Sequence, residues 1–460
     1  MIGRLFERDE LLKAYSSEYS EFVAVYGRRR VGKTFLIRET FDYKFTFQHA
    51  GLKKKSTEIQ LDRFRQSLVE SGYKDCPTLV NWYKAFDALK VVITESEETK
   101  KVVFIDEMPW MDRPNANFLS ALENFWNAWA TARKDILLIV CGSAASWVLK
   151  RVVHNKEGLH NRVTYRIPLQ PFTLRECEEY ANSRNLGLNR KQLAECYMVF
   201  GGIPYYWSLL RSDLSLAQNI DELLFSEGGK LRDEFNYLYA SIFKNAEPHL
   251  RVVEALAEKK SGLVREEIIA ATGLKNGGNF KTVLDELEQC DFIRSYTPVG
   301  KKNRGAVYQL IDNYVLFYFE FLEHRAGNDE HYWTHHYREP KLNSWRGRAF
   351  ERVCFWHIPQ IKAALGISGI AADVYSWLDA DAETGRRVQV DMVIERADNV
   401  VSMCEMKYAS GEFELKEAEA LNIERRVECL SAATKNRKAT QTVLVTPYGL
   451  KRNRHSDCVQ

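Results

Sequence analysis

The sequence lacks long apolar runs and paired cysteines. The longest apolar runs, such as ILLIVC at residues 136–141, are far shorter than the roughly 20 residues that a membrane-spanning helix needs. The N-terminus, MIGRLFERDE, is rich in charge and has no apolar stretch of the signal-peptide kind. The 9 cysteines are scattered without a CxxC pair, which is typical of reduced thiols and argues against a disulfide framework or a zinc site. These absences predict a cytoplasmic protein without membrane contact.

The sequence also lacks an excess of charge of one sign. Lys+Arg total 65 and Asp+Glu total 62, so the formal net charge is only +3. This balance excludes a polycationic binder, and any contact with nucleic acid must come from a local basic patch. The chain has 460 residues, 45% of them hydrophobic, so it can form several buried cores, and disorder over most of its length is excluded.

Apolar runs and helical patterns alternate over the first 175 residues. Strands are expected at residues 22–26, 44–47, 101–105 and 136–141, because short apolar runs are typical of strands buried on both faces of a parallel sheet. This pattern predicts an α/β domain. A helical segment follows to about residue 250, and the last hundred residues return to an α/β pattern.

The strongest motif is GRRRVGKT at residues 27–34, which fits the phosphate-loop pattern G-x-x-x-x-G-K-[ST]. A predicted strand precedes it and a predicted helix at residues 34–41 follows, as this motif requires. Glycines let backbone N–H groups wrap phosphates, and the helix N-terminus adds positive charge. Lys33 is expected to reach the β- and γ-phosphates of ATP, and Thr34 to ligate Mg²⁺. The residues expected to contact the nucleotide are Gly27, Arg28, Arg29, Arg30, Val31, Gly32, Lys33 and Thr34.

An acidic strand end should complete this site, and KVVFIDE at residues 101–107 supplies it. Asp106, at the end of an apolar strand, suits a water-mediated contact with Mg²⁺. Glu107 is the natural base to polarise an attacking water. The acidic pair therefore predicts ATP hydrolysis rather than phosphate binding alone, and it disfavours a small-molecule kinase.

Two further side chains are candidates for contact with the γ-phosphate. Ser143 follows the strand expected at 136–141 and could sense the γ-phosphate, although an ordinary strand-to-helix turn is the alternative. Arg162 could contact the γ-phosphate in cis or across the subunit interface of a homo-oligomer. A plain surface arginine is an equal alternative for Arg162.

Several segments resemble the STAND-related ATPases of archaea and bacteria: IGR near the start, YGRRRVGKTFLIRETF, FIDEMPWMD, FLSALENFWN, CGSAASW, LHNRVTYRIPLQPFTLRE and GGIPYYW. The resemblance covers residues 1–245. It implies a sheet in which the acidic strand is not adjacent to the phosphate-loop strand. It also implies that Gly3 and Arg4 lie near the adenine, that Pro204 packs on the nucleotide from a helical lid, and that Arg162 is the arginine of the family.

The middle segment predicts a winged helix. Helices are expected at residues 250–256, 264–271 and 279–289, and the turn between the last two contains glycine, as in helix-turn-helix motifs. A wing should follow, and Lys301, Lys302 and Arg304 at its tip could face DNA phosphates. The acidic residues of the third helix argue against strong sequence-specific readout. A structural module that packs on the nucleotide domain is the alternative.

The C-terminal segment contains a predicted hairpin, with strands at 388–396 and 400–409 joined through Asp398. A turn centred there pairs Asp391 opposite Glu405, and Lys407 lies on the same face as Glu405. Two neighbouring carboxylates repel each other unless a cation lies between them. A divalent metal between them would allow phosphodiester chemistry, in which Lys407 orients water or stabilises charge. Glu351, on a helix expected at 345–357, is a further candidate ligand.

This arrangement resembles the restriction-endonuclease-like PD-(D/E)XK fold, with Glu351, then Asp391, then Glu405 and Lys407 as E-x-K. It departs from the usual pattern at Val390, where a proline commonly precedes the aspartate. The resemblance implies a Mg²⁺ or Mn²⁺ site formed by Glu351, Asp391 and Glu405. An inactive domain with a salt-bridged hairpin is the alternative.

The sequence thus predicts an α/β multidomain protein. The predicted domains are a P-loop ATPase core (1–172), a helical lid (173–245), a winged helix (246–312) and a restriction-endonuclease-like domain (313–460). The predicted function is a Mg²⁺-dependent ATP-hydrolysing switch coupled to a nuclease-like part that acts on DNA. The alternative is an ATP-dependent DNA-binding regulator or scaffold with an inactive nuclease-like domain.

Overall fold

The computed structural model describes residues 2–142, 145–153, 158–159, 161–243, 245–259, 261–297, 305–323, 328–380, 385, 387–433 and 438–459. The chain divides into two compact units. The first comprises Met1–Pro171, Ala240–Ala246 and Thr282–Cys290, and the second comprises Phe172–Tyr239, Glu247–Lys281 and Asp291–Gln460. None of the helices in the described part has both the length and the hydropathy needed to cross a membrane.

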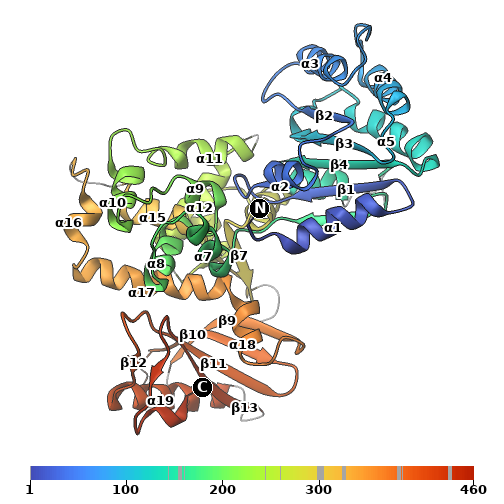
Figure 1. Ribbon diagram of the computed structural model, residues 1–460. Coiled ribbons are helices and arrows are strands. Elements are labelled where there is room, and N and C mark those ends of the chain that lie inside the picture. Colours follow the sequence, from blue (N-terminus) through green and yellow to red (C-terminus); the bar gives the residue numbers. More distant parts are fainter. Residues whose placement is uncertain are drawn as a thin grey trace. The chain divides into compact units, whose positions relative to one another are not determined.

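The first unit is built on a five-stranded parallel sheet with the order β2-β3-β4-β1-β5 (Figure 1). The strands are β1 (Glu21–Tyr26), β2 (Phe47–Ala50), β3 (Lys101–Asp106), β4 (Ile136–Gly142) and β5 (Tyr165–Pro168). β4 separates the acidic strand β3 from the phosphate-loop strand β1, as the resemblance implied. The strand expected at residues 44–47 was misplaced, because β2 begins at Phe47 and continues through the polar residues Gln48 and His49.

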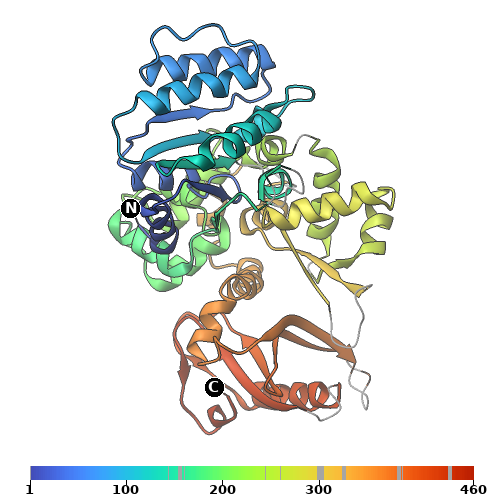
Figure 2. The same cartoon turned by 90° about the vertical axis from the view of Figure 1, so that its right-hand side faces the viewer.

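Helices cover both faces of this sheet. In Figures 1 and 2, α3 (Thr57–Glu70), α4 (Trp82–Glu95) and α5 (Phe118–Ala128) lie on one face, and α1 (Leu5–Ser16) lies on the other with α2 (Lys33–Thr40). Side-chain caps begin two of these helices: Ser56 Oγ accepts from the Ile59 amide, and Asn81 Oδ1 accepts from the Lys84 amide. Shorter elements follow β3, α5 and β4: η1 (Met108–Trp110), η2 (Ala130–Ala132), α6 (Ala145–Val148) and η3 (Leu149–Val153).

The second unit begins with helices, as expected for residues 173–245. They are α7 (Leu174–Ser183), α8 (Arg190–Phe200), α9 (Pro204–Ser208), α10 (Leu216–Ile220), η4 (Asp221–Phe225) and α11 (Glu234–Ile242). Three later helices pack on them: α15 (Asn313–Phe321), α16 (Tyr332–His336) and α17 (Pro340–Trp356). A fourth helix, α18 (Ile358–Ala364), contacts α17. Their contacts include a stacked pair, Phe235 and Tyr318, with ring centroids 4.1 Å apart.

The middle segment contains the three predicted helices. They are α12 (Glu247–Glu258), α13 (Arg265–Thr272) and α14 (Gly278–Gln289), and a small antiparallel sheet joins β6 (Leu263–Val264), β8 (Val307–Leu310) and β7 (Ile293–Tyr296) in that order. The predicted wing tip, with Lys301, Lys302 and Arg304, lies outside the described residues.

The C-terminal segment forms a four-stranded sheet with the order β13-β11-β10-β9. Its strands are β9 (Ala372–Ala380), β10 (Arg387–Arg396), β11 (Val400–Met406) and β13 (Ala439–Val445), and β11 and β13 run parallel. Helix α19 (Glu417–Ala433) lies along one face of this sheet (Figures 1 and 2), where apolar side chains from both elements form a core. A short pair, β12 (Phe413–Glu414) and β14 (Leu450–Lys451), and η6 (Ser456–Cys458) complete the fold.

Candidate nucleotide and metal sites

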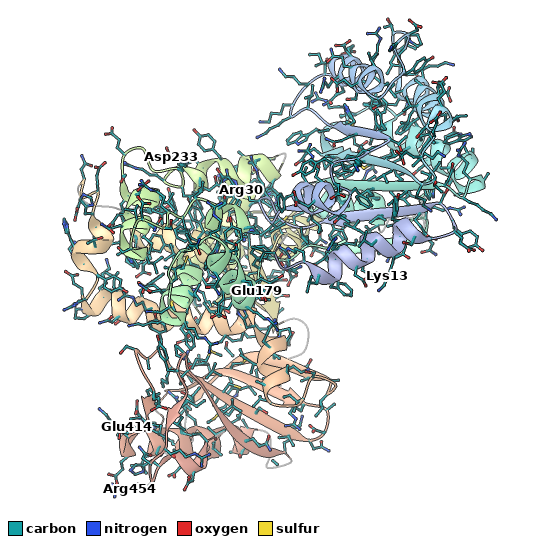
Figure 3. The ribbon with its side chains drawn as sticks, viewed as in Figure 1. Lys13, Arg30, Glu179, Asp233, Glu414 and Arg454 are labelled. Atoms are coloured by element: carbon teal, nitrogen blue, oxygen red, sulfur yellow. The ribbon has the colours of Figure 1, made fainter. Side chains whose placement is uncertain are left out.

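The loop between β1 and α2 has the backbone geometry that its glycines allow. Gly27 has φ 148°, and a Cβ atom on it would lie 2.3 Å from the Leu169 carbonyl oxygen. Gly32 has φ 92° and precedes the first residue of α2. Larger residues would clash or be strained at these positions, so both glycines are required for the loop to form. Arg30, labelled in Figure 3, also has a positive φ of 71°.

Lys33 is buried inside this loop, where only 7% of its surface is exposed. Its Nζ donates hydrogen bonds to the carbonyl oxygens of Gly27 and Arg28, both at 2.9 Å. Burial lowers the pKa of Lys33, and the negative charges of Glu107 and Asp106 partly oppose that change. The ammonium group is therefore held within reach of the loop amides, where phosphate oxygens would be bound.

Asp106 receives three hydrogen bonds at the end of β3. The Thr34 hydroxyl donates to Oδ2 at 2.7 Å, and the Glu107 amide donates to Oδ1 at 2.7 Å. The Cys141 thiol donates to the same Oδ1 at 2.6 Å. The structure thus brings together the three residues predicted from the motifs and adds Cys141, which fixes the orientation of the carboxylate.

Cys141 was missed from the sequence, although a signal for it exists. β3 and β4 are parallel neighbours with Ile105 opposite Val140, so the next residues, Asp106 and Cys141, meet at the same edge of the sheet. Burial and the nearby Asp106 raise the pKa of Cys141 well above its usual value. At neutral pH this side chain is therefore a neutral thiol that can donate a hydrogen bond.

The remaining predicted residues of the nucleotide site differ in what surrounds them. Arg4, with φ 60° and 6% exposure, donates from NH2 to the Val31 carbonyl oxygen at 3.2 Å, so the segment with Gly3 and Arg4 packs on the phosphate loop. Arg162 is exposed, and Ser143 lies outside the described residues. Pro204 is the first residue of α9, in the second unit.

The second candidate site lies on the C-terminal hairpin, whose predicted register is confirmed. β10 and β11 pair with Met392 opposite Cys404 and Val393 opposite Met403, and this register continues to Asp391 opposite Glu405. The β10 pairing with β9 shifts between Val390 and Val393, which is a bulge that changes where side chains point. Asp391 Oδ2 accepts a 3.4 Å hydrogen bond from the Met406 amide.

Glu405 is fully buried and close to two cations. Its Oε2 forms an ion pair with Arg426 of α19, and Lys407 Nζ is 3.7 Å from the same oxygen. Its Oε1 has no hydrogen-bond partner among the described residues. Burial and the charge of Asp391 raise the pKa of Glu405, and the two cations oppose that change. Arg426 was missed from the sequence, because nothing in the helix pattern indicates which residue of α19 faces β11.

Glu351 on α17 belongs to the same electrostatic neighbourhood. Burial and the charge of Asp391 raise the pKa of Glu351 to about 7. Burial likewise raises the pKa of Asp391, which Lys407 opposes. These carboxyl groups thus resist ionisation together. Within the described ranges, no three His, Cys, Asp or Glu side chains are grouped closely enough to hold a metal ion, so the expected three-carboxylate cage is not preformed.

Comparison with known proteins bears on the N-terminal part. Residues 2–210 match the family described as an ATPase domain predominantly from Archaea. An uncharacterised protein of Methanocaldococcus jannaschii, MJECL04, is 26% identical over 325 residues, which are 69% of this chain and 68% of the relative. Together with the phosphate loop, the family match identifies the N-terminal part as a P-loop ATPase domain.

Solved structures align with this chain only at low sequence identity. A Walker-type ATPase of Pyrococcus abyssi aligns with a TM-score of 0.48 and 15% identity, covering 70% of this chain and 96% of that chain. The ORC2 protein of Aeropyrum pernix aligns with a TM-score of 0.42 and 14% identity, covering 68% of this chain and 92% of that chain. Both TM-scores are below 0.5.

Proposed function

We propose that this protein is an ATP-hydrolysing switch whose N-terminal part controls a DNA-directed C-terminal part. One observation carries the first half of the proposal. The Thr34 hydroxyl, the Asp106 carboxylate and the Glu107 amide are hydrogen-bonded together, and Lys33 occupies the adjoining phosphate loop. A threonine hydroxyl and an aspartate carboxylate beside a phosphate-loop lysine are groups that P-loop NTPases use to hold Mg²⁺ and phosphate, which supports the proposal.

The side chains at this site fit a Mg²⁺ ion bound with ATP. The Thr34 hydroxyl and Asp106 Oδ2 are 2.7 Å apart, and Mg²⁺ prefers oxygen ligands of these kinds. Thr34 would hold the ion directly, and Asp106 would hold it through water. The ion would supply positive charge to the β- and γ-phosphate oxygens.

The other residues have proposed roles around the γ-phosphate. Glu107 accepts a proton from the attacking water, and Lys33 offsets the charge that builds up on the phosphate oxygens. Ser143 senses the γ-phosphate. Arg162, which is exposed, contacts it in cis or from a second copy in a homo-oligomer. Arg4 and Pro204 are proposed to contact the nucleotide, and Arg4 already packs on the loop.

Two variants test the hydrolytic site. Lys33→Ala should abolish nucleotide binding or hydrolysis, because the β- and γ-phosphates lose their main protein cation. Glu107→Gln should keep ATP binding and reduce hydrolysis by about 10²-fold or more, because the general base is lost. Phosphate release and binding of a fluorescent ATP analogue measure the two steps separately. Unchanged turnover in Lys33→Ala would reject the phosphate-loop assignment.

For the C-terminal part, we propose a restriction-endonuclease-like domain that acts on DNA. The opposed Asp391 and Glu405, with Lys407 beside Glu405, support it. The fully buried Glu405 Oε1 without a hydrogen-bond partner among the described residues fits a divalent cation, because a buried carboxylate oxygen needs a partner. Mg²⁺ or Mn²⁺ held there would polarise a phosphodiester. The middle segment is proposed to be a winged helix that contacts DNA or packs as a structural module.

A specific observation favours the alternative, a regulator that binds DNA without cutting it. Arg426 already forms an ion pair with Glu405 Oε2, so the charge of this carboxylate is balanced at least in part without a metal. A site in which arginine takes the role of the metal would lose cleavage.

Cleavage of plasmid DNA separates these two functions. The active-site proposal predicts nicking with Mg²⁺ or Mn²⁺, loss of nicking in Asp391→Asn, and unchanged ATP hydrolysis in that variant. Glu395→Gln is the matched control, because Glu395 is another β10 carboxylate whose partners are Tyr375 and Lys438. DNA binding without nicking, in the wild type and both variants, would establish the regulator instead.

A further inference from the structure

Glu107 has a backbone conformation that its surroundings must maintain. Its φ is 50°, in the left-handed region that a non-glycine residue rarely adopts. Such a conformation is strained and persists only where neighbouring contacts hold it. The contacts that hold this turn therefore determine where the carboxylate of Glu107 lies.

Two backbone segments enclose the turn. On one side, the Gly51 amide donates to the Asp106 carbonyl oxygen at 3.0 Å, and a Cβ atom on Gly51 would lie 2.6 Å from the Glu107 carbonyl oxygen. On the other side, the Trp110 amide donates to the Glu107 carbonyl oxygen at 3.1 Å. The loop after β2 and the 3-10 helix η1 thus bond the peptide carbonyl groups on either side of the Glu107 Cα atom.

Gln60 joins these two segments. This α3 side chain is fully buried. Its Oε1 accepts from the Leu52 amide at 2.9 Å, and its Nε2 donates to the Leu52 carbonyl oxygen at 2.6 Å and to the Trp110 carbonyl oxygen at 3.1 Å. The carboxamide thus uses its acceptor and both of its donor hydrogens. These hydrogen bonds link the loop after β2 to η1, the two segments that contact the turn of Glu107.

We propose that Gln60 is a positioning residue for ATP hydrolysis, which holds the turn of Glu107 in the geometry needed to activate water. The inference rests on the proposed role of Glu107. Among the described residues, the side-chain hydrogen bonds of Gln60 go to Leu52 and Trp110 and not to the phosphate loop or Lys33, so Gln60 should affect the hydrolytic step and leave nucleotide binding intact. A displacement of about 1 Å at a reacting group can reduce a rate by about 10²-fold.

The hydrogen bonds from Gln60 to Leu52 also bear on the position of a neighbouring cation, Lys53. Lys53 follows Leu52, and its Nζ is 5.9 Å from the centre of the Trp110 ring. Burial and the charges of Arg29 and Lys54 lower the pKa of Lys53, while Glu107 opposes this change. Loss of the Gln60 hydrogen bonds to Leu52, the residue before Lys53, would also displace this charge.

Two near-isosteric variants test the inference in the full-length chain with ATP and Mg²⁺. Gln60→Met removes all three hydrogen bonds, and Gln60→Glu turns the donor that faces two carbonyl oxygens into an acceptor. Both should reduce kcat by about 10-fold to 10²-fold, with KM and the affinity for a non-hydrolysable ATP analogue changed less than about twofold. Lys53→Met then tests whether the charge of Lys53 contributes to that loss.

Ser67→Ala is the matched control, because Ser67 is buried on the same helix and its hydroxyl is hydrogen-bonded to the Arg63 carbonyl oxygen and to His49, not to Leu52 or Trp110. It should keep the kcat of the wild type. Unchanged kcat in a folded Gln60→Met or Gln60→Glu protein would overturn the positioning role, as would an equal loss of analogue binding. A wild type that binds ATP and does not hydrolyse it would overturn the role of Glu107 and this inference together.

Discussion

At the scale of single residues, the orientation of Asp106 depends on donors of different kinds. Thr34 and the Glu107 amide are expected at a phosphate-loop site, whereas the thiol of Cys141 is an addition. Because the pKa of Cys141 is raised by burial, the thiol remains protonated and donates to a carboxylate. Hydrogen bonds to charged groups contribute about 1.5–3 kcal/mol.

The role of Cys141 can be tested with two small substitutions. Cys141→Ala should reduce ATP hydrolysis by about tenfold, the rate equivalent of about 1.4 kcal/mol, because Asp106 loses one of its orienting donors. Cys141→Ser should retain most of the activity, because a hydroxyl can replace the donor. Steady-state kcat measures both, and equal rates in the serine and alanine variants would contradict the role.

His49 shows how a buried polar residue on a strand affects stability. It lies on β2, its Nδ1 is 3.0 Å from the Ser67 hydroxyl, and its ring packs on Phe64 with centroids 4.9 Å apart. Burial, with a contribution from the charge of Arg63, lowers the pKa of His49 to about 3. The unfolded chain therefore binds a proton at this position more readily than the folded one.

This difference predicts a stability that depends on pH. Between the unfolded pKa of about 6.5 and the folded value of about 3, stability should fall as pH falls, by up to about 1.4 kcal/mol per pH unit from this one group. His49→Gln should flatten the pH dependence in that range. Urea titrations at several pH values measure it, and an unchanged slope in the variant would rule out His49 as the source.

At the scale of elements, sequence patterns predicted the features that depend on residues close together in the chain. The hairpin register followed from turn residues at 397–399, and the observed pairing of Met392 with Cys404 agrees with it. The phosphate loop and the end of β3 were also predicted, because both motifs need particular residues in one short segment.

The features that the sequence patterns missed depend on tertiary packing. β2 was misplaced because its buried positions include His49, which hydropathy does not count as apolar. Arg426 contacts Glu405, and Gln60 contacts Trp110, across long sequence separations, so no spacing rule finds these contacts. The bulge between Val390 and Val393 likewise produces no recognisable change in the apolar periodicity of the sequence.

At the scale of the whole molecule, helix α17 links two parts of the second unit. Its residue Arg346 is an ion-pair partner of Glu195 on α8, with NH2 to Oε1 at 2.9 Å. One turn later it carries Phe350, whose ring is 5.6 Å from that of Tyr408, and then Glu351 of the candidate metal site. Helix α17 therefore contacts both the helical region and the C-terminal sheet.

The Glu195–Arg346 pair is embedded in a polar cluster. Glu195 is fully buried and Arg346 is 4% exposed. The Tyr337 hydroxyl donates to Glu195 Oε2 at 2.9 Å, and burial with the charge of Glu195 raises the pKa of Tyr337 to about 12, so this donor persists at neutral pH. Arg346 NH1 also donates to the Tyr337 carbonyl oxygen and to Asn343.

Removing one partner should therefore be costly. Glu195→Gln leaves Arg346 buried without a counter-charge, which should lower the free energy of unfolding by about 3–5 kcal/mol. Glu179→Gln is the control, because its pair with Arg175 is exposed and should contribute less than about 1 kcal/mol.

Replacing Glu195 and Arg346 together by methionine should cost less than the sum of the single changes, because no unpaired charge remains. Urea unfolding of the full chain measures all of these variants. Equal losses in Glu195→Gln and Glu179→Gln, or additive losses in the double variant, would mean that the pair does not join α8 to α17 energetically.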